Sequence, residues 1–252
     1  MGFLARLKLE VKYIRRNEWS YHDVGAHWDS VIDYDEINKK SYSYFQRFVK
    51  AFEICTLPDK SYILDICSRT GNGTQYFFKK NKIRSAVCAD VTRNMQEICR
   101  DRLTQAGVDF TTVLFDSLPL PFENDTFEGI LCFETIEHMP EPASFLYELA
   151  RVLKKEGELI LTTPNRLWEP IHWIAAVLGL HHSEGFCSFL ARRFILREAM
   201  QSGLVVVREE SSVLLPFNHR WSIRLNTLLE KILPRLLLRC LALRRIFIFK
   251  KR

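Results

Sequence analysis

Three aspartates, Asp65, Asp90 and Asp116, are the residues whose types and spacing most clearly suggest chemistry. Asp65 lies in the apolar run Tyr62–Ile66, and the other two end the runs SAVCAD and TTVLFD. If these runs are neighbouring parallel strands, their carboxyl ends meet at one edge of the sheet. An acid after a strand is often only a helix cap or a turn residue. Three in succession favour a nucleoside ligand, with Asp90 placed for a ribose and Asp116 for an adenine amine.

The stretch that follows the first of these runs is the predicted ligand loop. Gly71 and Gly73 come shortly after Ile66, and a helix is expected over residues 73–80. A strand that ends in a glycine-containing loop before a helix brings backbone N–H groups against a ligand. The Gly-x-Gly-x-x-Gly and Walker signatures are both absent, so neither a dinucleotide nor a triphosphate is indicated.

Strands and helices are predicted to alternate from residue 61 onward, which favours a doubly wound α/β fold with a mainly parallel sheet. Residues 1–55 read as helical, with Tyr34–Ile54 apolar at helical spacing. Further helices are expected near residues 93–106, 142–154 and 190–202. The strands are expected at Tyr62–Ile66, Ser85–Ala89, Phe110–Phe115, Phe127–Phe133, Glu158–Thr163, Leu204–Glu209 and Ile246–Phe249.

Composition and length favour one domain over residues 1–252, with a helical region 1–55, a core 56–215 and a basic segment 216–252. The formal charge is +6, from 36 basic and 30 acidic residues. Residues 220–252 contain ten of the basic residues and one acid, which leaves 26 and 29 for the rest, so the basic character belongs to the carboxyl-terminal segment. Seven cysteines without a Cys-x-x-Cys pair indicate a reducing, cytoplasmic setting. No apolar run reaches the roughly 18 residues that a membrane-spanning helix needs.

The segment from Trp221 to Leu243 is rich in leucine and arginine, and Pro234 is placed to begin a second helix within it. A cationic amphipathic helix can lie in a membrane interface, so the protein is expected to be peripheral at a membrane. The same segment can instead pack over a ligand pocket as a lid, and the two roles are compatible. Nucleic acid is a weaker prediction, because no base-reading motif accompanies the charge. No motif specifies an oligomeric state.

Four segments together resemble the class I S-adenosylmethionine-dependent methyltransferases, in particular those acting on small molecules, quinones and glycolipids. They are ILDICSRTG, AVCADVTRNM, FDSLPLPFENDTFEGILCFETIEHMPEP and ARVLKKEGELILTTPN, and the resemblance covers about residues 40–215. It implies a Rossmann-like sheet of seven strands whose last strand is antiparallel, with a basic helical insert before that strand. It also implies S-adenosylmethionine as the cofactor.

The resemblance assigns roles to individual residues. Asp65 and the loop that follows it would hold the methionine part of the cofactor, the end of the second strand would hold the ribose, and the end of the third strand the adenine. The fourth strand would face the sulfonium side. In that order the residues are Asp65, Cys67, Ser68, Arg69 and Gly71; Asp90 and Val91; Asp116 and Ser117; and Phe133 with Glu134.

The predicted loop departs from the family pattern at two positions. The family usually has Asp-x-Gly-x-Gly-x-Gly, whereas this chain has Cys67 and Arg69 at the first two glycine positions and keeps only Gly71. Glycine suits such a loop because the backbone takes unusual dihedral angles close to the ligand. Arg69 could form an ion pair with the cofactor's carboxylate, or it could block the pocket.

Methyl transfer needs no covalent catalysis, but a hydroxyl acceptor needs a base. His138, just after the fourth predicted strand, is the best placed candidate, because an unperturbed histidine titrates near neutral pH. It could equally brace the following helix. Glu134 and Glu137 are alternatives, and Glu137 is expected to face solvent.

Histidines and tryptophans after the fifth predicted strand suit a phenol, quinone or sugar acceptor, although they could also be ordinary core and surface residues. They are His172, His181, His182, Trp168 and Trp173. Adjacent histidines without cysteine or carboxylate partners do not suit a metal, so no metal site is predicted.

The sequence therefore predicts an S-adenosylmethionine-dependent methyltransferase acting at oxygen on a small hydrophobic, lipid-linked or sugar-containing acceptor. The alternative is a methyltransferase-like binding or scaffold protein without catalysis, which the residues at positions 67 and 69 suggest. A third hypothesis is a membrane- or nucleic-acid-binding module that depends on the basic segment.

Overall fold

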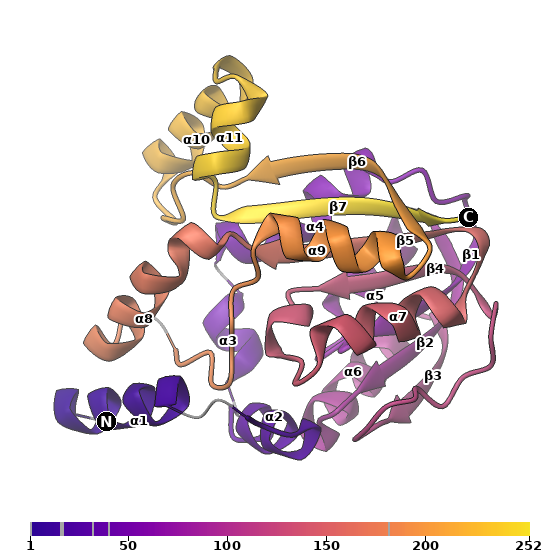
Figure 1. The fold of residues 1–252 in the computed structure, drawn as a ribbon, viewed down its shortest axis with the longest axis horizontal. Coiled ribbons are helices and arrows are strands. Elements are labelled where there is room, and N and C mark those ends of the chain that lie inside the picture. Colours follow the sequence, from indigo (N-terminus) through magenta and orange to yellow (C-terminus); the bar gives the residue numbers. More distant parts are fainter. Residues whose placement is uncertain (1, 16–17, 32, 40, 181) are drawn as a thin grey trace.

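A seven-stranded sheet with helices on both faces forms the centre of the protein (Figure 1). The computed structural model describes residues 2–15, 18–31, 33–39, 41–180 and 182–252. The strand order is β3-β2-β1-β4-β5-β7-β6, and the pairs among β1 to β5 are parallel. β7 runs antiparallel to both β5 and β6. The predicted doubly wound, mainly parallel sheet with an antiparallel last strand is confirmed.

The strands lie where the apolar runs predict them. Their bounds are β1 Ser61–Ile66, β2 Ile83–Asp90, β3 Asp109–Leu114, β4 Phe127–Phe133, β5 Leu153–Pro164, β6 Leu204–Ser212 and β7 Arg244–Lys251. The helix before β5 was expected to continue to residue 154. It ends at Val152, and β5 begins at the next residue.

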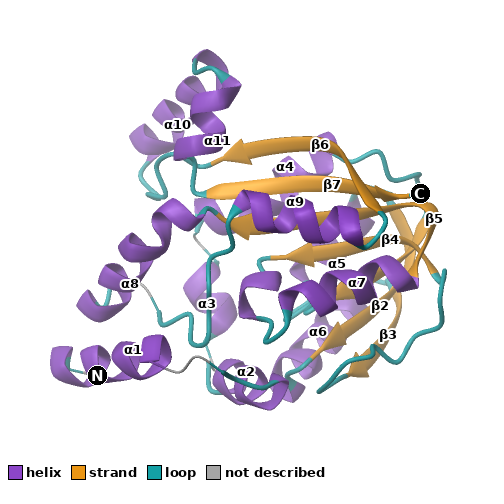
Figure 2. Cartoon of the chain, in the orientation of Figure 1, coloured by secondary structure: helices purple, strands orange, loops and turns teal. Residues whose placement is uncertain are grey.

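The helices surround this sheet as shown in Figure 2. Before β1 lie α1 Phe3–Arg15, α2 Tyr21–Asp29, α3 Tyr34–Asn38 and α4 Tyr42–Ile54; between β1 and β5 lie α5 Asn72–Lys79, α6 Arg93–Gln105, η1 Ile136–His138 and α7 Pro142–Val152; after β5 lie η2 Arg166–Trp168, α8 Glu169–Leu178, α9 Arg192–Gln201, α10 Arg220–Ile232 and α11 Arg235–Leu241. α4, α5 and α6 pack in series on one face of the sheet, and α7 packs with α9 on the other.

The long helix expected over Tyr34–Ile54 is divided in the structure. Ser41 begins α4 as its N-cap, with its hydroxyl accepting a hydrogen bond from the Tyr44 backbone N–H. A capping hydroxyl satisfies one of the free N–H groups at a helix start. The break turns α3 toward the carboxyl edge of the sheet, and sequence periodicity alone did not predict it.

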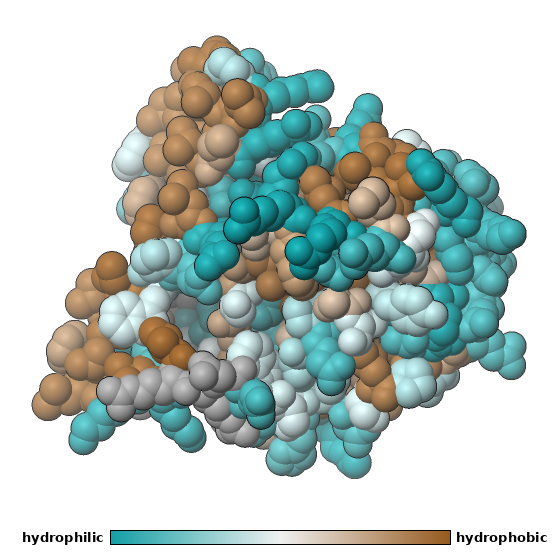
Figure 3. Space-filling model, in the orientation of Figure 1, coloured by the Kyte–Doolittle hydropathy of each residue, from teal (hydrophilic) through white to brown (hydrophobic). Residues whose placement is uncertain are grey.

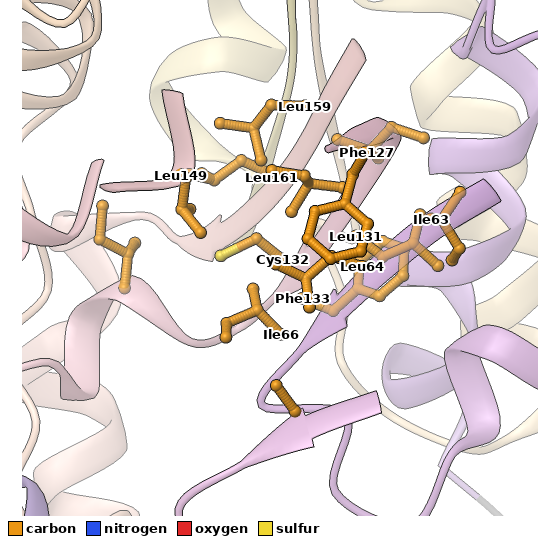
Figure 4. Packing of buried hydrophobic residues seen from close by; sticks show 14 of the residues in the cluster. Ile63, Leu64, Ile66, Phe127, Leu131, Cys132, Phe133, Leu149, Leu159 and Leu161 are labelled. Carbon is orange, nitrogen blue, oxygen red and sulfur yellow. The ribbon is translucent and has the colours of Figure 1, made fainter. Parts of the chain in front are cut away.

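The core lies on both faces of β1 and β4, the two central strands. Figure 4 shows Ile63 and Leu64 of β1 packed beside Leu131 of β4, with Leu159 and Leu161 of β5 next to them. All five side chains are fully buried. Each such side chain stabilises the fold by roughly 1.5–3 kcal/mol, so the central strands hold the carboxyl edge of the sheet in a fixed place.

The basic segment forms the two helices that its pattern predicts. α10 and α11 project from one corner of the molecule, and Pro234 is the N-cap residue of α11. Within the described part of the chain, we find no helix with the length and apolar character that a bilayer crossing requires.

Candidate active site

The loop between β1 and α5 has the backbone shape of a glycine loop without its glycines. Cys67, Arg69 and Gly71 have φ angles of 52°, 50° and 75°. For a residue with a Cβ atom the left-handed conformation costs roughly 1–2 kcal/mol. Local strain of this kind persists only where surrounding structure fixes it, and it is concentrated at functional sites.

Asp90, at the end of β2, fixes this loop. Its carboxylate accepts hydrogen bonds from the Arg69 backbone N–H (2.6 Å) and from the backbone N–H and hydroxyl of Thr92. Burial raises the pKa of Asp90, although these hydrogen bonds and the Arg69 charge act in the opposite direction. The acid predicted to bind a ribose is thus also the anchor of the loop.

Asp65 lies beneath the same loop. Its carboxylate accepts hydrogen bonds from the Thr74 hydroxyl (2.6 Å) and backbone N–H (3.1 Å). Burial raises its pKa to about 7, and the nearby Asp90 charge acts in the same direction. The structure therefore brings Asp65 and Asp90 together. Asp116 is exposed just beyond β3, where it accepts a hydrogen bond from Ser117.

A narrow hollow lies between the loop, the end of β2 and helix α2. Of the predicted residues, Cys67, Arg69, Asp90, Val91 and His138 line it. Its volume is about 10 Å³. A single water needs roughly 10–15 Å³ by the same measure, so the hollow is nearly filled by the protein itself.

The side chain of Arg69 lies at this hollow and is packed against Trp28, which also lines it. Its guanidinium carbon lies 3.9 Å from the centre of the Trp28 ring. Its two terminal nitrogens donate hydrogen bonds to the Tyr34 hydroxyl (2.9 Å) and to the Glu134 backbone carbonyl (3.1 Å). A guanidinium stacked on an indole is attracted by the ring's electrons. In this conformation the guanidinium is held by Trp28, Tyr34 and the Glu134 backbone.

Helix α2 holds Trp28 over the hollow. A capping box of Ser20 and Asp23 fixes its start, and Gly25 packs so closely on β2 that a Cβ there would lie 2.6 Å from the Val91 carbonyl oxygen. Only glycine allows this approach. The hollow is therefore covered by a well-packed helix.

A wide cavity of about 400 Å³ lies beside the narrow hollow, at the ends of β4, β5 and β7. Arg69 and His138 line both spaces. Known ligand pockets measure about 300–1,000 Å³, so this cavity has the size of a small-molecule site. Its aromatic and apolar wall is formed by Tyr34, Tyr44, Trp168, Ile171, Phe189 and Phe217.

Glu134 and Arg244 form a buried ion pair in the wall of the wide cavity. The Arg244 Nε and Glu134 Oε1 atoms lie 3.0 Å apart. Burial would raise the pKa of Glu134, but the charges of Arg244 and Arg47 outweigh it and lower that pKa. Glu134 is thus ionised and paired, which makes it a poor proton acceptor.

His138 lies in η1, also at this wall. Its Nδ1 atom is 3.0 Å from the Phe186 carbonyl oxygen, which can only accept, so Nδ1 carries the proton. Burial and the Arg69 charge lower its pKa to about 4. Near neutral pH the ring is therefore uncharged, with Nε2 as a hydrogen-bond acceptor 3.8 Å from Glu184.

The expectation that Glu137 faces solvent is wrong. The residue is buried, and its carboxyl group accepts a hydrogen bond from the Thr163 hydroxyl at 3.0 Å. Burial raises its pKa, and the charge of Glu134 raises it further. η1 turns Glu137 inward, which the short sequence IEHMP did not indicate.

The remaining predicted residues lie around these two spaces. Ser68 and Gly71 are buried within the loop, and a Cβ on Gly71 would meet Cys99. Phe133 lies in the core, where it packs on Phe48. Of the residues proposed for an acceptor pocket, Trp168, His172 and His182 line the wide cavity. Trp173 does not line it, and His181 lies outside the described residues. No group of three potential metal ligands occurs among the residues that the structure describes.

Several site residues were absent from the sequence-based prediction. Trp28, Tyr34, Tyr44 and Arg47 belong to the helices before β1, and Arg244 begins β7. The apolar spacing of residues 34–54 signalled packing on the sheet and gave no sign of a cavity wall. A buried arginine at the start of a terminal strand had no signal.

Residues 64–161 match the family model of a methyltransferase domain. Over these residues the chain is similar to that domain, and its fold is that of the class I S-adenosylmethionine-dependent methyltransferases. S-adenosylmethionine is the cofactor of this family.

Among relatives, the ubiquinone/menaquinone biosynthesis C-methyltransferase UbiE of Burkholderia mallei is 28% identical over 161 residues. The alignment covers 63% of this chain and 66% of that protein, just under two thirds of its length. Among solved structures, the [4+2]-cyclase SpnF matches with a TM-score of 0.65 at 16% identity, over 92% of this chain and 96% of SpnF. An S-adenosylmethionine-dependent methyltransferase from Mesorhizobium loti matches with a TM-score of 0.60 at 12% identity, over 81% of this chain and 96% of that chain. These structural likenesses concern the fold.

The residues suit S-adenosylmethionine in kind, but the narrow hollow does not have room for its adenosyl group. Acids end β1 and β2, and the loop has left-handed backbone at all three expected positions. Trp28 and Arg69 fill the space above them. To hold the adenosyl group in this hollow, these two side chains would have to move.

Proposed function

We propose that this protein methylates a small, largely hydrophobic acceptor held in the wide cavity, with S-adenosylmethionine bound on the side of the narrow hollow. The observation that carries this proposal is the contact between the two spaces: Arg69 and His138 line both, so a donor and an acceptor would meet there. When bound, the cofactor would supply a methyl group on a sulfonium. The protein's part would be to orient both molecules and keep water out.

The cofactor residues in this proposal are those at the ends of β1 and β2. Asp90 already accepts three hydrogen bonds, and a carboxylate has about four acceptor positions, so one remains for a ribose hydroxyl. Val91 would lie beside the ribose, and Asp116 with Ser117 beside the adenine. Asp65, Phe133 and residues 67–71 would form the methionine end, with Arg69 turned away from Trp28.

For the acceptor side, we propose His138 as the residue that orients a hydroxyl and receives its proton. Its uncharged ring offers Nε2 to the site, and its Nδ1–H is fixed by Phe186. A histidine with a pKa of about 4 is a weak base, which suits a phenol better than an alcohol. We propose an oxygen as the methylated atom. Methylation at carbon is the competing possibility, because the UbiE relative is named a C-methyltransferase.

Calorimetry with S-adenosylhomocysteine and a methyl-transfer assay test this function. Labelled S-adenosylmethionine would be offered with phenols whose alkyl chains increase in length. We expect product with the longer chains, and a decrease in kcat of roughly 10²–10⁴-fold in the His138→Ala variant. Mass spectrometry of the product separates oxygen from carbon methylation. Binding of S-adenosylhomocysteine without product from any phenol would refute the acceptor class.

A binding protein without catalysis is a second candidate, favoured by the way Trp28 and Arg69 fill the hollow. The same calorimetry separates the two. Absence of heat at millimolar S-adenosylhomocysteine, with the protein folded by circular dichroism, would favour the binding protein.

We also propose that the acceptor is lipid-linked and that the protein reaches it at a membrane surface. Helices α1, α8, α10 and α11 adjoin one another: Arg6 of α1 donates to the Val177 carbonyl of α8, and Trp168 donates to the Leu241 carbonyl of α11. Figure 3 shows apolar surface gathered over α8, α10 and α11. The exposed apolar side chains on these helices and their flanks are Phe3, Leu4, Ile14, Leu167, Ile171, Ile174, Leu178, Leu180, Phe217, Trp221, Leu225, Leu228, Ile232, Leu236, Leu237 and Leu241.

Two features support lipid as the occupant of this apolar face. Ile171, Leu180 and Phe217 belong both to the face and to the wall of the wide cavity, so an acceptor could pass from one to the other. Exposed Arg220, Arg224, Lys231 and Arg235 on α10 and α11 would attract anionic lipid, by about 1 kcal/mol each. The free cysteines support a reducing, cytoplasmic side of that membrane.

Vesicle sedimentation tests the membrane contact. We expect binding to vesicles containing phosphatidylserine and its loss in a Trp221→Glu/Leu228→Glu variant. Met200→Glu/Val207→Glu is the matched control, since both residues are exposed and apolar but lie away from these helices. Equal binding of the two variants would contradict the proposal.

A further inference from the structure

Arg47 is a buried cation on the wall of the wide cavity. It belongs to α4, is 8% exposed and lines the cavity. Its Nε donates to the Tyr44 carbonyl (2.9 Å), and its guanidinium lies over the Tyr44 ring at 4.2 Å. Among the described residues, none provides a carboxylate within 4.0 Å of it, and its two terminal nitrogens have no protein acceptor. These nitrogens are therefore available to a ligand.

Arg244, which lies nearby, shows what a structural arginine looks like in this cavity. It contacts both Glu134 oxygens, and its third nitrogen donates to Ser43. Its donors are thus used within the protein. Arg47 makes one backbone hydrogen bond and stacks on a ring, although it is almost as deeply buried. The two arginines are similarly buried, but Arg244 has protein partners for its nitrogens whereas the terminal nitrogens of Arg47 have none among the described residues.

The protein itself offers Arg47 no close counter-charge among the described residues. Glu134 pairs with Arg244, and the Arg69 guanidinium is held by the Tyr34 hydroxyl and the Glu134 backbone carbonyl. A buried charge without a counter-charge is costly. A bound anion would provide one.

We propose that Arg47 binds an anionic group of the acceptor, a carboxylate or phenolate attached to an apolar body. This inference rests on the proposed function in treating the ligand as a methyl acceptor. Binding of an anion by Arg47 does not itself require catalysis. Arg47 donates from its two terminal nitrogens to the anion, as a guanidinium does to a carboxylate in a paired geometry. Trp168, Phe189 and Phe217, which also line the cavity, contact the apolar body. Arg47 is thus a specificity residue for the charge of the acceptor.

Calorimetry with two small ligands of equal shape tests this site. 4-Hydroxybenzoate carries the anion, and 4-hydroxybenzamide is its uncharged counterpart. We expect the wild type to bind the carboxylate about tenfold more tightly or better, since one charge-assisted contact supplies that factor. Arg47→Gln should bind both ligands equally, and Arg47→Lys should keep most of the preference. Arg193→Gln removes one exposed charge on α9, whose residues do not line the cavity, and should behave as wild type.

Several results would overturn the proposal. They are equal binding of the two ligands by wild type, a preference that survives in Arg47→Gln, and failure of folded wild type to bind 4-hydroxybenzoate at millimolar concentration.

A second pair of ligands separates the acceptor's anion from the carboxylate of the cofactor. The ratio of affinities for S-adenosylhomocysteine and 5′-methylthioadenosine should be unchanged in Arg47→Gln, and a fall in that ratio would assign Arg47 to the cofactor instead. A carboxylate preference without methyl transfer would support the anion site and refute the proposed reaction. Methyl transfer without that preference would support the reaction and refute the anion site.

Discussion

The narrow hollow and the wide cavity lie at the same edge of one sheet and differ in how their acids are held. At the hollow, Asp90 is bonded to hydroxyl and backbone donors, as is Asp65 beneath the loop, and burial raises the pKa of both. In the cavity, Glu134 is paired with Arg244, and its pKa is lowered. The hollow, beside the arginine stacked on a tryptophan, has a volume of about 10 Å³, whereas the cavity has about 400 Å³.

This difference indicates how the two halves of a transfer site can be built on one scaffold. The hollow uses donors that a ligand can replace or share, because hydrogen bonds from N–H and O–H groups to a carboxylate leave acceptor positions free. The cavity uses a fixed ion pair, which holds its wall whether or not a ligand is present. We therefore expect changes on the cavity side to affect stability, and changes on the hollow side to affect cofactor affinity and pH dependence.

The largest expected effect is the loss of the Glu134–Arg244 pair. Glu134→Gln leaves Arg244 buried without a counter-charge, which costs roughly 3–5 kcal/mol of unfolding free energy. Urea denaturation measures it. Glu36→Gln is the matched control, because Glu36 pairs with Lys39 on the surface and its loss should cost less than about 1 kcal/mol. Equal losses for the two variants would show that the cavity wall does not rest on this pair.

The pH dependence of Asp65 is next in size. Its folded pKa of about 7 lies above the usual value of about 3.9 for an aspartate. Between pH 4 and pH 7 the unfolded chain releases this proton and the folded chain keeps it. The contribution of Asp65 to stability is therefore complete below pH 4 and falls by up to roughly 4 kcal/mol as the pH rises to 7.

Denaturation of wild type and Asp65→Asn at several pH values checks this expectation. The variant cannot titrate at this position, so its stability relative to wild type should rise between pH 4 and pH 7 and then stay level. Parallel pH profiles for the two proteins would contradict a raised pKa.

Opening the hollow should increase cofactor affinity. Trp28→Leu removes the ring on which Arg69 stacks. If the closed form accounts for about 90% of the molecules, opening it tightens the apparent binding of S-adenosylhomocysteine up to about tenfold. Calorimetry measures the change, with the exposed Trp221→Leu as control. Weaker binding in Trp28→Leu would mean that the indole contacts the cofactor.

The smallest effect concerns strain in the loop. Cys67→Gly relieves a left-handed backbone, worth roughly 1–2 kcal/mol, but it adds chain entropy to the unfolded state, worth about 0.5–1 kcal/mol. We expect a net stabilisation below about 1 kcal/mol. Gly71→Ala is the opposite control: its φ is 75°, and the new Cβ would lie 2.7 Å from the Cys99 sulfur. A destabilised Cys67→Gly would indicate that packing of the thiol outweighs the strain.

The sequence predicted the sheet well because strand formation depends on local pattern. Apolar runs such as Tyr62–Ile66 and Phe127–Phe133 are long enough to be buried on both faces, and the structure contains strands there. The acids near the carboxyl ends of β1 and β2 could be placed at that edge of the sheet for the same reason. The break between α3 and α4 was not predicted, because a single capping serine decides it.

What the sequence determined by itself is the order of the strands along the chain, the position of the loop and the two acids beneath it. Only the tertiary structure decided which of these groups are free to meet a ligand. Arg69 is held by Trp28 and Tyr34, and Glu134 is paired with Arg244, which is 110 residues further along the chain. The energy of an ion pair or a stacked ring depends on distance in space and on burial. Such pairs therefore depend on how distant elements pack, and no local pattern in the sequence encodes them. The closed hollow and the charged wall of the open cavity are properties of the folded chain.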